Sequence, residues 1–451
     1  MNVKQFYDTG LAHASYAIVS QGKMAVVDPA RDPQPYYEHA QEHGAEIVAV
    51  FETHPHADFI SSHREIADHT GATIYVSELL GADYAHETFD EGDELKMGEV
   101  TFTALNTPGH SPDSITIVLR DPEGNDHAIF TGDTLFIGDV GRPDLREKAG
   151  NMWAMREDLA RQMYHSTREK LMPLAPEVLI YPAHGAGSLC GKNLSDETVS
   201  TMGQQLKENY ALQPMSEEEF VKELLDGQPF IPKYFAYDVG INKAGAPTFE
   251  ESIAAVPRLA ADAELKEGLL VIDTRPAEQF RAGHLPGAIN LMDGGKFETW
   301  LGSIVGPEEK FYLIAESEEV REAVIRKAAK IGYEPNIEGA LLTLAQAPEQ
   351  APDLDLAAFK ANPEAFNVVD IRNVGEYNSG AFFDHAVNLP LADLRERAEE
   401  VATDKPVVVH CAGGYRSAAG ASIVKRVLGD QATVYDLSEA VEDFQPAEAS
   451  H

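Results

Sequence analysis

Histidine and aspartate side chains follow apolar, strand-like segments throughout the first 205 residues of the chain. A buried strand is expected at residues 47–51, and later ones at 101–105, 114–119 and 128–131. Loops at strand ends are where a rigid scaffold presents chemistry. One lone histidine is most often a surface residue or a satisfied core residue. The repeated placement beyond strands predicts a shared metal site built from His54, His56, Asp58, His110, Asp133 and His184.

The neighbouring segments complete the local pattern of this region. Residues 16–19 and 24–28 predict a β-hairpin around Gln21-Gly22. A helix is expected over residues 60–69 and is ended by Gly71. Alternating strands and helices of this kind indicate a mixed α/β and α+β architecture.

Length and charge limit the classes of partner. A chain of 451 residues is expected to form two to four domains. The formal charge is −38, from 36 basic and 74 acidic residues, which argues against nucleic acid and anionic membrane surfaces as partners. No apolar run reaches the roughly 18 residues needed to span a bilayer, and the N-terminus lacks a signal-peptide pattern. The two cysteines, Cys190 and Cys411, form no disulfide framework, so a cytoplasmic location is expected.

The last 190 residues contain an internal repeat. Asp273 and Asp370 are offset by 97 positions, and Gly283 and Gly380 keep the same offset. Each copy is expected to form a compact α/β unit with a parallel sheet. We therefore divide the chain into the metal-site region, a helical and loop-like bridge without chemistry of its own, and two repeated domains: 1–205, 206–262, 263–348 and 349–451.

The second copy carries a reactive loop. An apolar strand at residues 407–409 leads through His410 to Cys411, and a helix is expected over residues 418–428. Small residues allow the loop to curl so that backbone N–H groups point inward, and the helix N-terminus and Arg416 add positive charge. Such a cradle stabilises a thiolate and then a cysteine persulfide. The cradle residues are Ala412, Gly413, Gly414, Tyr415 and Ser417.

The first copy lacks this nucleophile. The offset between the copies places Glu316 opposite Cys411, and residues 315–319 contain three glutamates. These carboxylates would repel an anionic sulfur donor. The first copy is therefore expected to be inactive and to serve as a spacer or docking element.

Both regions resemble known families. The histidine and aspartate pattern resembles the metallo-β-lactamase superfamily over roughly residues 1–205, and segments 53–58 and 138–145 resemble the persulfide dioxygenases. The Cys-x-x-x-x-Arg-Ser loop is shared by tyrosine phosphatases and rhodaneses, and the Asp-x-Arg motifs of both copies resemble the rhodaneses. The resemblance implies an αββα sandwich followed by two rhodanese-like α/β domains with parallel sheets, the first without its cysteine.

The resemblance also implies a metal and its ligands. Persulfide dioxygenases carry one iron(II), held here by the residues matching His54, His110 and Asp133, while His56, Asp58 and His184 would orient ligands or substrate. In the superfamily pattern a further histidine would stand at Phe59, and a phenyl ring cannot bind metal. This departure favours one metal ion over two, and iron-dependent oxygen chemistry over hydrolysis. A single zinc ion can also activate water, so a hydrolase stays open.

Two further residues have alternative roles. Arg142 either anchors an anionic thiol substrate or pairs with Asp139 or Asp144. Cys190 is either an inert buried thiol or a functional one, whose pKa Lys192 and the nearby glycines would lower.

The expected function is oxidation of a low-molecular-weight thiol persulfide to sulfite by O2, in sulfide detoxification. Cys411 would exchange sulfane sulfur among thiol persulfide, sulfite and thiosulfate. The alternative enzyme is a zinc thioester hydrolase of glyoxalase II type fused to a rhodanese, and a non-enzymatic scaffold with decayed sites is the third hypothesis. The sequence leaves open which thiol is used, whether the protein forms homo-oligomers, the direction of sulfur transfer, and whether sulfur passes directly between the sites.

Overall fold

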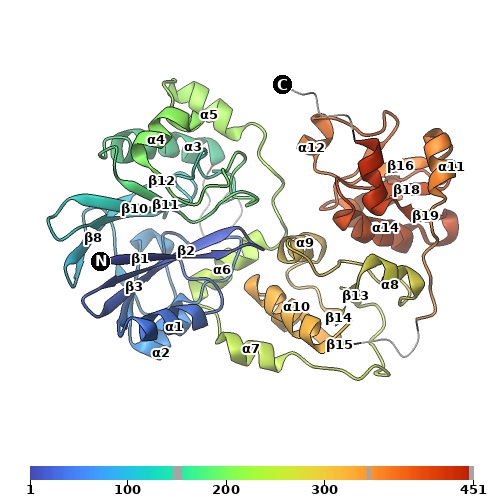
Figure 1. Cartoon of the computed structure of the whole chain (residues 1–451), viewed down its shortest axis with the longest axis horizontal. Coiled ribbons are helices and arrows are strands. Elements are labelled where there is room, and N and C mark those ends of the chain that lie inside the picture. Colours follow the sequence, from blue (N-terminus) through green and yellow to red (C-terminus); the bar gives the residue numbers. More distant parts are fainter. Residues whose placement is uncertain (146–154, 343–346, 446–451) are drawn as a thin grey trace. The chain divides into compact units, whose positions relative to one another are not determined.

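The computed structural model describes residues 1–145, 155–342 and 347–445, in two compact units (Figure 1). The first unit comprises Met1–Ser252 with Ala329–Gly332, and the second comprises Ile253–Ala328 and Tyr333–His451. The finer boundaries at 205, 262 and 348 stay predictions.

In its described residues, the first unit contains two six-stranded sheets. The strands of the first sheet, in spatial order, are β1 (Asn2–Asp8), β2 (His13–Ser20), β3 (Lys23–Val27), β4 (Glu46–Phe51), β5 (Thr73–Val76) and β6 (Glu87–Thr88). Those of the second are β12 (Ser200–Thr201), β11 (Leu179–Pro182), β10 (Asp126–Gly132), β9 (Ile115–Arg120), β8 (Val100–Asn106) and β7 (Glu94–Met97). The predicted hairpin is the antiparallel pair β2–β3.

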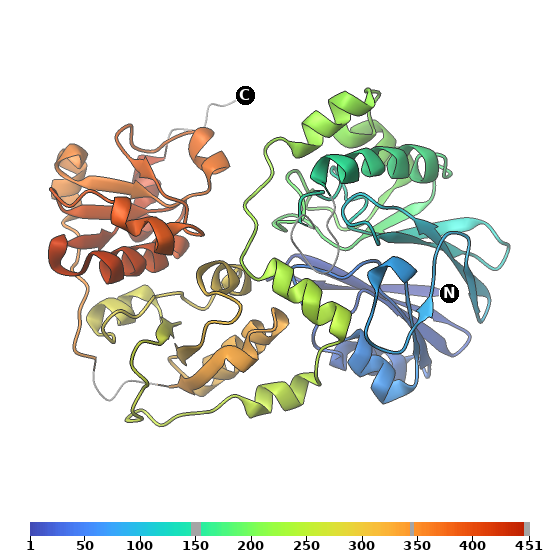
Figure 2. The ribbon, with the colours of Figure 1, turned by 180° about the vertical axis from the view of Figure 1, so that it is seen from behind.

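Helices cover the outer faces of the two sheets. Tyr16, Phe51, Phe102 and Phe130 belong to one buried cluster whose residues come from both sheets. A second cluster packs α1 (Gln34–Glu42) and α2 (His63–Thr70) on the first sheet. A third packs α3 (Arg156–His165) and α5 (Glu217–Leu225) on the second sheet, as Figure 2 also shows. This is the predicted αββα sandwich.

The helix expected over residues 60–69 starts later, at His63, and ends at Gly71, whose φ is +76°. Residues 60–62 lie outside the helix because other segments bind their backbone. The amide of Ile60 donates to the carbonyl of Lys330, and the amide of Ser61 donates to the side chain of Asn242. These long-range partners were invisible to the local sequence pattern.

The predicted metal-type residues follow strands, as expected. His54, His56 and Asp58 follow β4, His110 follows β8, Asp133 follows β10 and His184 follows β11. The parallel pair β10–β11 brings the last two of these loops together at one sheet edge.

The bridge is helical, with α4 (Met202–Glu208), α5, α6 (Phe235–Ala244) and α7 (Phe249–Ala255). No helix in the described ranges has the length and apolar content that a membrane crossing requires.

The second unit contains two parallel sheets, which confirms the predicted repeat. The first sheet consists of β13 (Leu270–Asp273), β14 (Phe311–Ile314) and β15 (Ile337–Leu341), and the second of β17 (Val387–Asn388), β16 (Asn367–Asp370), β18 (Val407–His410) and β19 (Val434–Asp436). The α-helices described in this unit beyond α7 are α8 (Ala277–Ala282), α9 (Phe297–Ile304), α10 (Glu318–Lys330), α11 (Leu356–Ala361), α12 (Val374–Asn378), α13 (Leu394–Arg397) and α14 (Tyr415–Leu428).

The repeated Asp-x-Arg motifs have the same structural role in both copies. Arg275 pairs with Asp273 and donates to the carbonyl of Gly283 at 2.9 Å. Arg372 pairs with Asp370 and donates to the carbonyl of Gly380 at 3.0 Å. These ion pairs join a strand end to the following loop, as expected for scaffold residues.

Candidate functional site

Three of the predicted metal-binding side chains surround one buried point. His54, His110 and Asp133 are each 2% exposed and offer ligand atoms that lie within 4.8 Å of one another. The Oδ2 atom of Asp133 lies 3.7 Å from Nε2 of His54 and 3.4 Å from Nε2 of His110. Neither oxygen of Asp133 accepts a hydrogen bond from a nitrogen or oxygen donor in the described ranges. Two imidazoles and a buried carboxylate in this arrangement fit a divalent metal ion.

Hydrogen bonds orient both imidazole rings. Nδ1 of His110 lies 2.9 Å from the carbonyl oxygen of Arg142 and donates to it. Nδ1 of His54 lies 3.0 Å from Oγ1 of Thr53, which itself donates to Asp28. These bonds hold the proton of each ring on Nδ1, so that the lone pair of Nε2 faces Asp133. This tautomer is the one that can bind a metal ion.

His56 lies beside this group and faces two other carboxylates. Its Nε2 atom lies 3.1 Å from Oδ1 of Asp28 and 4.0 Å from Oε2 of Glu52. Burial lowers the pKa of His56, but the carboxylates of Asp28 and Glu52 outweigh burial and raise it overall. The orienting role implied for His56 stays a prediction.

Asp58 and His184 lie on the other side of Asp133, together with Cys190. Nε2 of His184 lies 3.3 Å from Oδ2 of Asp58 and 3.5 Å from Oδ1 of Asp133. Burial lowers the pKa of His184, but these two carboxylates raise it overall to about 9. Asp133 therefore presents one oxygen to each side of the pocket.

Lys192 does not direct its ammonium group at Cys190, which removes the physical basis for one of the two alternatives given for this thiol. Cys190 is 1% exposed, and burial raises the pKa of its thiol well above the ordinary value, with Asp58 and Asp133 raising it further. The ammonium group of Lys192 instead donates to the carbonyl oxygens of Glu223 and Asp226. Cys190 is therefore a buried thiol beside the candidate metal ligands, in surroundings that raise its pKa.

Phe59 fills the position where a further imidazole was expected. Its ring is 1% exposed and packs against His13 at 3.8 Å and His56 at 4.4 Å between ring centroids. The phenyl ring supplies packing and no ligand atom.

Arg142 is held by an ion pair, one of its two expected roles. Its guanidinium donates to both oxygens of Asp144 at 2.7 and 2.8 Å and to the carbonyl of Leu189 at 3.2 Å. The side chain is 1% exposed. Its fixed position supports the backbone carbonyl that binds His110, while the role of substrate anchor stays a prediction.

Asn242 of α6 shows that the bridge does more than connect domains. Its Nδ2 group donates to the carbonyls of His56 at 2.8 Å and Phe59 at 2.7 Å, and its Oδ1 accepts from the amide of Ser61 at 2.8 Å. Asn242 is 1% exposed. The assignment of residues 206–262 as a segment without chemistry of its own stays a prediction, but the segment has a structural role, because Asn242 holds the loop that carries His54, His56 and Asp58.

Replacing Asn242 with alanine is expected to weaken metal binding about 10- to 100-fold, since groups that orient ligands have effects of this size. The measurement is metal content after dialysis against a graded chelator. Asn290→Ala is the matched control, because Asn290 is equally buried and binds two carbonyls, those of Asp273 and Arg275, in the second unit. Equal metal retention by Asn242→Ala and wild type would contradict this role.

Gly141 leaves room for the metal ligands. A methyl group there would overlap the carbonyl oxygen of Asp133 and lie 3.0 Å from the Cβ and Nδ1 atoms of His110. We expect Gly141→Ala to lower the free energy of unfolding by about 1–3 kcal/mol and to reduce metal retention. Thermal unfolding checks this, with Gly240→Ala on α6 as control, because a methyl group there meets no atom within 4 Å. Identical destabilisation by both substitutions would count against the steric argument.

The loop that carries Cys411 joins β18 to α14. The amide of Gly414 donates to Sγ of Cys411 at 3.2 Å, and the φ of Gly414 is +93°. Ser417 donates to the carbonyl of Gly414 at 2.9 Å and closes the turn. One backbone amide of the predicted cradle therefore reaches Sγ of Cys411, and the cradle as a whole stays a prediction.

Arg416 has a partner that sequence reasoning missed. Its guanidinium forms two 2.7 Å hydrogen bonds with Glu376 of α12. Burial alone would raise the pKa of Glu376, but Arg416 outweighs it and the pKa is lowered. The ion pair moderates the positive charge that Arg416 brings to Cys411.

The first repeat contacts this loop from within the same unit. The hydroxyl of Tyr415 donates to the carbonyl of Met292 at 2.9 Å, and the guanidinium of Arg416 lies 5.6 Å from the ring centre of Trp300. Glu316, opposite Cys411 in the repeat, accepts from Gln279 at 2.8 Å. The first repeat thus lacks a nucleophile but forms part of the surroundings of Cys411.

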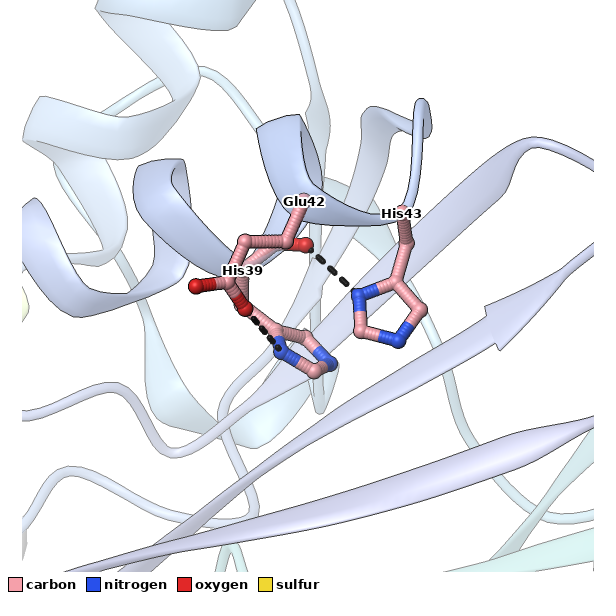
Figure 3. Close-up of side chains that lie close together, drawn as sticks. All are labelled: His39, Glu42 and His43. Carbon is pink, nitrogen blue, oxygen red and sulfur yellow. Dashed lines mark hydrogen bonds and ion pairs between the residues drawn. The ribbon is translucent and has the colours of Figure 1, made fainter.

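A separate histidine group lies at the end of α1 (Figure 3). Nδ1 of His39 lies 4.0 Å from Glu42, and Nδ1 of His43 lies 3.0 Å from the carbonyl of His39. Glu42 and His43 are exposed. Helix geometry accounts for these contacts, and we assign no function to this group.

Known families match both units. The Metallo-beta-lactamase superfamily matches residues 8–184, and the Rhodanese-like domain matches residues 258–339 and 355–447. The chain is 32% identical over 200 residues to the human mitochondrial persulfide dioxygenase ETHE1, covering 44% of this chain and 69% of the human protein. It is also 32% identical over 174 residues to the cytoplasmic hydroxyacylglutathione hydrolase of Arabidopsis thaliana, covering 38% of this chain and 62% of that protein.

A solved structure is similar to this chain over three quarters of its length. A metallo-beta-lactamase from Staphylococcus aureus subsp. aureus COL is 34% identical, with a TM-score of 0.68, over 75% of this chain and 99% of that one. Family, fold and site geometry therefore agree: the chain belongs to the metallo-β-lactamase superfamily, as a homologue of the persulfide dioxygenases that carries rhodanese-like domains behind the metal-site fold.

Proposed function

We propose that this protein oxidises a low-molecular-weight thiol persulfide with O2 at one iron ion and transfers sulfane sulfur through Cys411. The observation that carries the proposal is the His54, His110 and Asp133 group, with both Nε2 atoms directed at an unshared carboxylate oxygen. This donor set fits a ferrous ion, which when bound would supply activation of O2. The similarity to persulfide dioxygenases supports the same reaction class.

The overall oxidation is balanced with one water molecule. A thiol persulfide, O2 and water yield a thiol and sulfurous acid, so the sulfane sulfur loses four electrons and O2 gains them. Asp58 and His184 lie on the side of Asp133 away from His54 and His110 and would orient the persulfide. Burial of the ligand set keeps bulk water out and strengthens the electrostatic contacts with an anionic sulfur.

The transfer step uses the second repeat. The Cys411 thiolate attacks the outer sulfur of thiosulfate, forming a cysteine persulfide and releasing sulfite, and the reverse step returns the sulfur to sulfite. The Gly414 amide, 3.2 Å from Sγ, would stabilise the anionic sulfur. Because both sites belong to one chain, each site is present at a raised effective concentration near the other.

Metal analysis combined with oxygen uptake tests the proposal. We expect about one iron per chain and oxygen consumption with a member of a panel of thiol persulfides, with sulfite as the product. The rival, a zinc thioester hydrolase, is favoured by the similarity to hydroxyacylglutathione hydrolase. Zinc at full occupancy with thioester hydrolysis and no oxygen uptake would establish the rival and refute the dioxygenase proposal.

A further inference from the structure

His13 is a buried imidazole at the metal pocket that the proposed reaction leaves without a role. It begins β2 and is 1% exposed. Its ring centre lies 3.8 Å from that of Phe59 and 5.7 Å from that of His184. Among the described residues, no group of ligand atoms within 4.8 Å of one another includes His13. His13 therefore lies beside the metal-type side chains without being one of the candidate ligands.

The backbone before His13 adopts a strained conformation that fixes its place. Ala12 has a φ of +51°, in the left-handed region that residues with a β-carbon rarely adopt. The carbonyl oxygen of Ala12 accepts from the amide of Gly185 at 3.1 Å and lies 3.2 Å from Nδ1 of His184. His13 itself pairs with His184 in an isolated antiparallel bridge. Strain of this kind persists where the surrounding structure requires one geometry, and here it ties His13 to the loop of His184.

One ring nitrogen of His13 has a partner and the other has none. Burial, together with His184 and His56, lowers the pKa of His13 well below its ordinary value, which favours the neutral imidazole. A hydrogen bond with the backbone of Asp28 acts the other way and raises the pKa, so the ring is the donor in that bond. Nε2 lacks a hydrogen-bond partner in the described ranges. The proton of the neutral ring is thus on Nδ1, and Nε2 presents a buried lone pair.

A buried lone pair of this kind selects a donor. Leaving it unpaired is costly, so a ligand that offers an N–H or O–H group gains from the contact, whereas a ligand that offers a second lone pair is repelled. The proposed substrate would enter with its sulfur at the metal ligands. The atoms a few bonds behind the sulfur are then those that can reach a ring outside the ligand set.

We propose that His13 is a substrate-binding residue of the oxidation site, and that its Nε2 atom accepts a hydrogen bond from an N–H group of the thiol. The substrate class is a persulfide whose thiol carries an N–H two carbons from sulfur, as thiols built on cysteine or cysteamine do. This inference rests on the proposed function, because it assumes that a thiol persulfide binds at this pocket. It adds a contact that distinguishes one thiol from another.

Two thiols that differ in a single group test this contact. N-acetylcysteamine carries the N–H, and 2-mercaptoethyl acetate has an ester oxygen in its place. We expect anaerobic calorimetry to show that the iron-loaded full-length chain binds N-acetylcysteamine about 10- to 100-fold more tightly than the ester. In His13→Phe this ratio should fall close to one, because a phenyl ring keeps the packing on Phe59 and lacks the acceptor. His13→Gln, whose Oε1 can accept, should retain part of the preference.

His63→Phe is the matched control. His63 is 0% exposed on α2, and neither of its ring nitrogens has a hydrogen-bond partner in the part of the chain that is described. This variant should keep the wild-type ratio. A ratio of two ligands within one variant is not changed by incomplete metal loading or incomplete folding, so a weaker protein still gives a clear result.

Equal affinity of the wild type for the two thiols, no measurable binding of either, or a wild-type ratio in His13→Phe would overturn the role of His13. Oxygen uptake with the persulfide of N-acetylcysteamine is measured separately. Its absence alongside a preserved binding ratio would refute the proposed oxidation and leave the His13 contact standing.

Discussion

Asp133→Ala is expected to lose its metal and its oxygen uptake together. Asp133 is the single carboxylate in the group with His54 and His110, and both of its oxygens face metal-type side chains. Removing it leaves two neutral imidazoles, which bind a divalent ion far more weakly. Because loss of a group that merely orients a ligand costs 10- to 100-fold in affinity, loss of this ligand should cost about 100-fold or more.

Iron content after dialysis and oxygen consumption with a thiol persulfide measure this effect. Asp126→Ala is the control, since Asp126 lies at the other end of the same strand and pairs with Arg120 on the surface. Thiosulfate-dependent sulfur transfer should persist in both variants, because Cys411 lies in the second unit. Unchanged iron content in Asp133→Ala would refute the ligand set.

Cys411→Ser is expected to abolish sulfur transfer and to spare oxygen uptake. The sulfur carried between donor and acceptor is bound covalently to this thiol, and a hydroxyl cannot form the persulfide. Loss of a nucleophile that acts with its surroundings as a unit lowers the rate about a thousandfold or more. Steady-state transfer from thiosulfate measures the loss, and oxygen consumption with a thiol persulfide measures what is kept.

The first repeat offers a matched comparison for this prediction. Glu316→Cys placed in the Cys411→Ser chain introduces a thiol at the equivalent position of the first copy. Its loop has glutamates at 318 and 319 and no counterpart of the Gly413-Gly414 pair, so activity should not return. Retained transfer in Cys411→Ser alone would exclude Cys411 as the carrier.

Much of the metal centre could be predicted because its signals are local. The loop after β4 carries three metal-type residues within five positions. The strand-like segments before His110, Asp133 and His184 can each be recognised from their own residues. The rhodanese repeat is equally local, since each Asp-x-Arg pair bonds within its own strand–loop unit. Patterns of this kind depend on the side-chain periodicity of helices and strands and on short spacings in the sequence. Both can be recognised without knowing the fold.

The parts that failed all depend on contacts between distant segments. Lys192 is two residues from Cys190, yet its ammonium group turns to carbonyls more than 30 positions away, so the charge expected at the thiol is absent. The Arg416–Glu376 pair spans 40 positions, and the Asn242 contacts with the metal loop span more than 180. No spacing rule identifies such partners.

The sequence by itself determined which residue types are available and how they are spaced: the histidines and aspartates of a candidate metal site, a cysteine loop in the second repeat, and its absence from the first. Only the tertiary structure decided how these groups are charged and paired. Charge state depends on burial and on neighbours within a few ångströms, and packing brings those neighbours from anywhere in the chain. That is why burial and two carboxylates raise the pKa of Cys190, although Lys192 and the nearby glycines left a lowered pKa open as an alternative.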